Sequence, residues 1–211
     1  MRTSHKEMRR KINAEVSKIT DEELFSSAAF AAYLTDIAEA VTKRYKRKLR
    51  VETIYDTSEN VMIACTNNRN ILINTGNYIS WSMPYRKLKA ESILGLVGHE
   101  VGHMLFTNFR ISETYFSELS YGRLYPQMEL SEEEQESFTE VTDYFKTGTE
   151  AQKQAILKAA KLLLNILEDA YIEARICDRY TGRFATGIHL NNIRFTEMMP
   201  SVTEQLTNGC Y

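Results

Sequence analysis

Apolar residues recur every three to four positions over much of the chain, and this spacing predicts a mostly helical protein. The first such stretch begins at the capping box Thr20-Asp21-Glu22-Glu23 and predicts a helix to about residue 48. Two further boxes, Ser131–Glu134 and Thr149–Gln152, predict helices over about 131–146 and about 150–179. The last of these is apolar on most of its sides, which predicts that it is buried.

After the first predicted helix, the pattern changes to alternating apolar and polar residues and to short runs rich in β-branched residues. Val51–Tyr55, Val61–Cys65 and Ile71–Ile73 predict a small sheet of about three strands within 51–74, the last two forming a hairpin. We expect a loop over 75–86, a helix over about 88–108 and irregular structure over 110–130.

The length of 211 residues suits one domain, which we divide into an N-terminal lobe, 1–108, and a C-terminal helical lobe, 109–211. An apolar content of 43% is enough for a core, so disorder is not expected. The net charge of −2 gives no general attraction to nucleic acid. We expect either a stand-alone domain or the N-terminal part of a longer protein.

The cysteines point to a reducing compartment. Cys65, Cys177 and Cys210 are odd in number and widely spaced, so they predict no disulfide framework. The N-terminus has no apolar signal core, and no apolar run approaches the roughly 20 residues that span a bilayer. We therefore expect a cytoplasmic protein that does not enter the membrane.

The residues that carry chemistry lie in the helix predicted over about 88–108. His99 and His103 are four positions apart, so they share one helix face and their rings can reach the same ion. Glu100 points to a different position and is suited to hold a water molecule and take its proton. This HExxH pattern predicts a Zn²⁺ site with Glu100 as the catalytic general base.

The arrangement resembles the zincin metallopeptidases. In that family a strand borders the cleft above the HExxH helix, and a later helix supplies a third ligand. Here the strand corresponds to Asn70–Asn74, and Asn165–Glu173 is similar to the N-x-x-E-D-x-x-I-E stretch of bacterial and phage metallopeptidase-like proteins, often joined to a von Willebrand A domain. The likeness covers about residues 60–180. It implies an α+β, zincin-like fold in which the buried helix over about 150–179 completes the site.

Two carboxylates compete for the third ligand position. The likeness to zincins with a glutamate ligand implies Glu168. The helix projection instead places Asp169 and Glu173 together, near Leu162 and Ile166 on the side expected to be buried. In that second interpretation Asp169 binds the metal and Glu173 orients a ligand histidine.

Two further residues are weaker candidates for a catalytic role. His189, expected in a loop, has the chemistry to stabilise the oxyanion of a tetrahedral intermediate or to act as a distal ligand, although a surface histidine is the simpler interpretation. Tyr171 is a candidate for the same oxyanion role.

These features together predict a zinc-dependent metallopeptidase that acts on a peptide or protein substrate, whose backbone we expect to pair with the 70–74 strand. The alternative is a non-catalytic zinc-binding scaffold that recognises a partner and works with a von Willebrand A domain or an ATPase. A site closed by four protein ligands would favour that scaffold, whereas an open position would favour catalysis.

Overall fold

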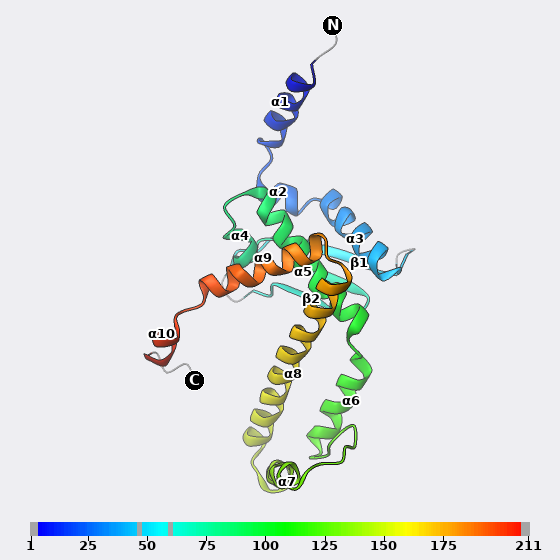
Figure 1. The fold of residues 1–211 in the computed structure, drawn as a ribbon, viewed down its shortest axis with the longest axis vertical. Helices are drawn as coiled ribbons and strands as arrows, with labels where there is room; N and C mark the ends of the chain where they lie inside the picture. Colours follow the sequence, from blue (N-terminus) through cyan, green and yellow to red (C-terminus); the bar gives the residue numbers. More distant parts are fainter. Residues whose placement is uncertain (1–3, 46–47, 59–60, 208–211) are drawn as a thin grey trace. The chain divides into compact units, whose positions relative to one another are not determined.

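The computed structural model describes residues 4–45, 48–58 and 61–207, and these fall into two compact units. One unit contains residues 1–105 and 173–211, and the other contains residues 106–172. Figure 1 shows the helices and strands in chain order. The chain therefore leaves the first unit near residue 105 and returns to it within a helix near residue 173.

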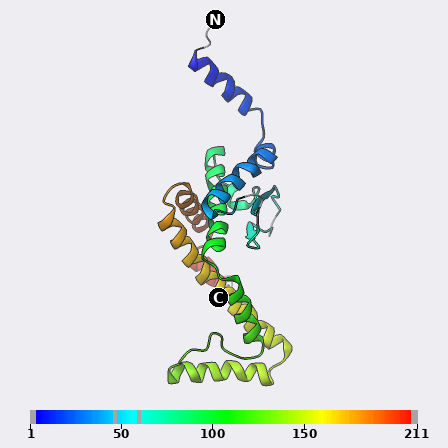
Figure 2. The same cartoon turned by 90° about the vertical axis from the view of Figure 1, so that its right-hand side faces the viewer.

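The first unit holds the sheet and most of the helices. Its elements are α1 (His5–Val16), α2 (Asp21–Phe25), α3 (Ala28–Thr42), β1 (Arg50–Ile54), β2 (Ala64–Thr66), β3 (Asn70–Asn74), α4 (Tyr78–Trp81), α5 (Arg86–Phe106), the end of α8 (Glu150–Arg179), α9 (Arg183–Met198) and α10 (Val202–Thr207). The second unit holds α6 (Phe109–Ser120), α7 (Glu132–Thr147) and most of α8. Within it, α7 lies across the ends of α6 and α8 in both views (Figures 1 and 2).

The expected three-stranded sheet and its hairpin are confirmed. The strand order is β1-β3-β2, with β1 parallel and β2 antiparallel to β3. Ile71 and Ile73 of β3 are fully buried, so the central strand supplies the apolar face of the sheet. The second strand is shorter and later than expected, since only Ala64–Thr66 pair with β3. A mostly helical chain with one small mixed sheet belongs to the α+β class.

The prediction of one continuous helix from about 21 to 48 is wrong. The box at Thr20 does start a helix, but α2 ends at Phe25 and α3 begins again at Ala28. The Ser27 hydroxyl accepts from the Phe30 amide and caps α3, so a serine inside the apolar pattern starts a new helix. The helix α3 then ends at Thr42, because Lys43 adopts a left-handed conformation with φ 57°.

Two segments expected to be irregular contain helices. The range 75–86 includes α4, and 110–130 begins inside α6. Each helix is capped by an asparagine: the Asn77 side chain accepts from the Ser80 amide and the Asn108 side chain from the Ile111 amide. The expectation missed both helices because neither Asn is followed by the acidic third residue that completes a capping box.

The bounds expected for α8 are confirmed, but the prediction that this helix is buried is wrong. Ile172 and Ile176 are buried, whereas several apolar side chains before them are more than half exposed. The apolar pattern shows that α8 has apolar residues on more than one face, but it does not show how much of each face is covered. The exposed apolar side chains are Leu162, Leu163, Ile166, Leu167 and Tyr171.

Helices α5 and α9 approach each other closely where both carry glycine. A Cβ built on Gly95 would lie 2.3 Å from the Gly187 carbonyl carbon, and one built on Gly187 would lie 2.4 Å from the Glu91 carbonyl oxygen. The obstructing atoms belong to the backbone, so no rotamer change relieves the clash. The two helices can therefore pack at this distance only with glycine at both positions. Among the described helices, none combines the length and apolar character needed to cross a bilayer.

We expect Gly187→Ala to lower the free energy of unfolding by about 1–3 kcal/mol, because the added methyl group forces α9 away from α5. Chemical denaturation followed by circular dichroism measures this. The control is Thr186→Ala at the neighbouring exposed position, for which we expect a change of about 0.5 kcal/mol or less. Equal stability of the two variants would contradict the proposed close packing.

Candidate metal centre

The two histidines of the HExxH motif point toward the same place. His99 and His103 lie one turn apart on α5, and their Nε2 atoms are 3.2 Å apart. The two rings are steeply inclined, at 75°, with centroids 4.9 Å apart. The i, i+4 spacing alone brings the rings to one face, and their rotamers bring the two Nε2 atoms together.

The other nitrogen of His99 is bound by a carboxylate from α8. His99 Nδ1 lies 2.9 Å from Glu173 Oε1, and both side chains are about one-quarter exposed or less, at 22% and 24%. An ionised carboxylate only accepts, so this contact requires the proton on Nδ1. In the neutral ring Nε2 then carries the lone pair, which is the form that binds a metal.

Helix α9 holds Glu173 in turn. Asn192 Nδ2 donates to Glu173 Oε2 at 2.9 Å, and the adjacent Asn191 Nδ2 donates to the Ser92 carbonyl of α5 at 3.0 Å. The side chain of Asn192 therefore restrains the carboxylate that orients His99. Sequence reasoning missed this residue because no motif connects it to His99; only the packing of α9 on α5 does so.

Of the two carboxylates expected as the third ligand, Asp169 lies with the two histidines and Glu168 does not. The possible ligand atoms of His99, His103 and Asp169 all lie within 4.8 Å of one another. Glu168 does not belong to that group, and no other such group occurs among the residues described. Asp169 lies one helical turn before Glu173, so one face of α8 presents both carboxylates.

The donor atoms fit a zinc ion. Tetrahedral zinc with Zn–N distances of about 2.0–2.1 Å separates two nitrogen ligands by about 3.3–3.4 Å. The two Nε2 atoms are 3.2 Å apart, close to this value. Two imidazoles and one carboxylate are also the donor set of catalytic zinc sites, which leave one position open.

The side chain of Glu100 is 5% exposed and lies near strand β2. Burial, and then the negative charge of Glu100, raise the pKa of the Cys65 thiol on that strand. Burial, and then the charge of Glu173, likewise raise the pKa of Cys177. Both thiols therefore stay protonated at neutral pH and are poor competitors for a metal ion.

The C-terminal end of α5 is held by an arginine. Arg44 Nη1 donates to the backbone carbonyl and the side chain of Asn68, at 2.6 and 2.8 Å, and Nη2 donates to the Met104 carbonyl at 3.1 Å. Met104 directly follows His103. One guanidinium group thus connects the β2–β3 turn to the last turns of the helix that carries both histidines.

The weaker candidates do not join this cluster. His189 lies within α9 rather than in the expected loop, and its side chain is exposed. Tyr171 is also exposed, at 52%. Neither residue belongs to the group of possible ligands.

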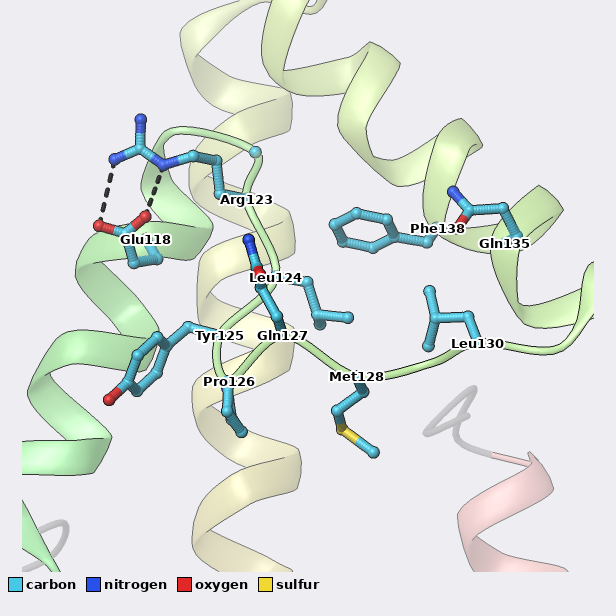
Figure 3. Close-up of a pocket in the computed structure, with 11 residues that line it drawn as sticks. Glu118, Arg123, Leu124, Tyr125, Pro126, Gln127, Met128, Leu130, Gln135 and Phe138 are labelled. Carbon is cyan, nitrogen blue, oxygen red and sulfur yellow. Dashed lines mark hydrogen bonds and ion pairs between the residues drawn. The ribbon is translucent and has the colours of Figure 1, made fainter.

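A pocket of about 810 Å³ lies in the second unit, in the loop between α6 and α7. Figure 3 shows Glu118 and Arg123 paired at its edge and Phe138 directed toward Leu124. These two paired residues are the only charged side chains that line it. The one carboxylate that lines the pocket is therefore already paired with an arginine.

No protein-family model matches the chain, and comparisons with curated proteins and with solved structures find no match either. The interpretation of the site therefore depends on its own geometry.

The position of Glu100 is testable through Cys65. We expect Glu100→Gln to lower the pKa of Cys65, because the substitution removes the negative charge that helps to raise it. The thiolate fraction at a given pH below that pKa should rise, and with it the rate of alkylation by iodoacetamide.

The measurement is alkylation against pH in chelator-treated protein, with each cysteine followed by peptide mass spectrometry. Cys177 is the internal control, since its pKa depends on burial and Glu173. An unchanged rate at Cys65, or an equal rise at both cysteines, would contradict the proximity of Cys65 to Glu100.

Proposed function

We propose that this chain is a zinc-dependent metallopeptidase of the zincin type, with Glu100 as its general base. His99 and His103 hold the ion, and Asp169 completes the protein ligands. Glu173 orients His99 from the opposite side of the ring. The substrate is a peptide or protein.

One observation carries this proposal. The Nε2 atoms of His99 and His103 are 3.2 Å apart, while a carboxylate occupies Nδ1 of His99. A hydrogen bond between the two imidazoles would account for the 3.2 Å contact alone. A shared cation accounts for that contact together with the carboxylate on Nδ1 of His99 and the nearby carboxylate of Asp169, because a histidine that binds a metal usually donates its other N–H to such a partner.

A zinc ion in this position would acidify a water molecule and polarise the substrate carbonyl. The chain's own residues supply the proton transfers. Glu100 takes the proton of the attacking water and passes it to the nitrogen of the departing amine, so that the peptide bond breaks. Its burial keeps bulk water from competing for this carboxylate and strengthens its electrostatic effect.

The expected pairing of a substrate with the 70–74 strand is wrong, because β3 is the central strand and both of its edges are already paired. Strand β2 lies at an edge of the sheet, and its Cys65 is close enough to Glu100 for that charge to act on it. We infer that an extended substrate adds to β2 instead.

We expect Glu100→Gln to keep zinc bound while peptide hydrolysis falls by about 10²–10⁴-fold, because the amide cannot accept the proton. Metal content by mass spectrometry and cleavage of a casein-derived peptide mixture measure the two effects. Unchanged hydrolysis would remove Glu100 from the mechanism. A wild-type protein that binds zinc and cleaves nothing would favour the scaffold function.

We expect Asn192→Ala to weaken zinc binding by about 10-fold and Glu173→Ala by up to about 100-fold, because each releases the orientation of His99. Competition with a chromogenic chelator gives the affinities. His189→Ala on the same helix serves as control and should leave zinc affinity unchanged. A loss in the His189 variant equal to that of Asn192→Ala would show that His189 contributes to the site.

A further inference from the structure

Helix α1 is exposed on every side. None of its 12 residues is buried, and each of them from His5 to Val16 is exposed. A helix of this length is only marginally stable in water when nothing packs against it. The described part of the chain thus leaves α1 exposed, and a contact with another molecule would stabilise it.

One side of α1 is apolar. At about 100° per residue, Met8, Ile12 and Val16 fall within about 80° around the helix axis. These three side chains, the apolar arc of α1, are 52%, 56% and 45% exposed. Apolar residues that repeat at such spacings on one face are the pattern by which an amphipathic helix enters an apolar groove.

The adjacent side of α1 is basic. Arg9, Lys6 and Arg10 follow the apolar arc and span about 100° around the axis. We call these three residues the basic arc. The two acidic residues of the helix are used locally, one in the N-terminal capping box and one in an ion pair with Lys18. A partner of α1 should therefore combine apolar and acidic groups.

The second unit carries the opposite charge. Residues 106–172 contain twelve Asp and Glu against six Lys and Arg, a net charge of −6, whereas the rest of the chain has a net charge of +4. Many of these carboxylates lie on α7. Four of them are exposed and fall within about 100° around the helix axis: Glu132, Glu133, Glu136 and Glu140. A basic helix is thus attracted to the second unit.

An apolar pocket lies beside this acidic side of α7. It is the pocket of about 810 Å³ in the loop between α6 and α7, with Leu124, Leu130 and Phe138 in its lining (Figure 3). Gln135 of α7 also lines it, and Glu132 lies only about 60° from Gln135 around the helix axis. The second unit therefore places a pocket for apolar side chains next to carboxylates, just as α1 places its apolar arc next to its basic arc.

We propose that α1 of one copy of this chain binds the second unit of another copy. The apolar arc enters the pocket, and the basic arc lies against the carboxylates of α7. A second copy is the partner because the chain itself supplies both complementary surfaces. The proposal does not depend on the function proposed above, since no residue of the candidate metal centre takes part.

The first experiment measures the mass of the full chain in solution. Sedimentation velocity over a range of protein concentrations should show a mass that rises with concentration. We expect the Kd of self-association to increase at least about tenfold between about 50 and 500 mM salt, because salt screens exposed charges. A protein that is still monomeric at about 200 µM and low salt would overturn the proposal.

Charge exchange then tests which surfaces meet. One variant reverses the basic arc and the other reverses α7, with the substitutions Lys6→Glu, Arg9→Glu and Arg10→Glu in the first and Glu133→Lys, Glu136→Lys and Glu140→Lys in the second. We expect each variant alone to associate at least about tenfold more weakly, because like charges then meet. Mixing the two variants should restore association, since the acidic α1 of the first meets the α7 lysines of the second. A mixture that stays monomeric would contradict the proposed contact.

A matched control separates this contact from a general effect of charge. Lys48→Glu, Arg69→Glu and Lys87→Glu change the net charge as much as reversal of the basic arc, at exposed positions of the first unit outside α1. We expect this control to associate within about twofold of wild type. An equal loss in the control and in the α1 variant would show that net charge alone governs association, and the proposal would fail.

The apolar arc has a test of its own. Met8→Ser with Ile12→Ser should raise the Kd of self-association about tenfold at unchanged charge, because the pocket loses its apolar occupants. Circular dichroism checks that the variant keeps its helix content. Unchanged association in this variant would remove the pocket from the contact.

Two other occupants are distinguishable outcomes, and each would overturn the proposal. A protein that stays monomeric but sediments with vesicles containing phosphatidylserine uses α1 to bind an anionic membrane. A protein that stays monomeric while reversal of the basic arc speeds hydrogen exchange in α7 binds α1 within its own chain.

Discussion

The close approach of α9 to α5 is the contact on which the candidate centre depends. Gly95 and Gly187 let the two backbones meet where any side chain would separate them. That contact places Asn191 against the Ser92 carbonyl and Asn192 against the carboxylate of Glu173. Glu173 in turn selects the tautomer of His99. A packing interaction without any ionisable group thus determines which nitrogen of a histidine faces a metal ion.

The parts of this structure that follow from local chemistry were predictable. The capping boxes at Thr20, Ser131 and Thr149 mark real helix starts. In each, the hydroxyl accepts from the backbone amide three residues later, and the side chain of that later residue accepts from the amide of the capping residue. The two histidines were predictable for the same reason, since their i, i+4 spacing is a property of one helix. The contact between Asn192 and Glu173 was not, because it exists only once two helices have packed.

Burial was the property that the sequence described least well. The apolar pattern of α8 gives its bounds, but it does not say how many of its faces are covered. Leu162 and Ile166 were expected on the buried side with Asp169 and Glu173, and the shared face is retained while the burial is not. Periodicity reports which residues point the same way; it does not identify what lies opposite them. The expected burial of these two residues is therefore wrong, although the expected face is right.

The two carboxylates of α8 illustrate why helix phase matters more than residue type at this site. Glu168 and Asp169 are adjacent and both acidic, yet about 100° of rotation separates them. Only Asp169 shares a face with Glu173, and only Asp169 groups with the two histidines. A glutamate in place of Asp169 would carry the same charge one methylene farther out, whereas a one-residue shift in register would turn the charge away. Under the proposed function, Asp169 therefore binds the ion, and Glu173, one turn later on α8, orients the ligand His99.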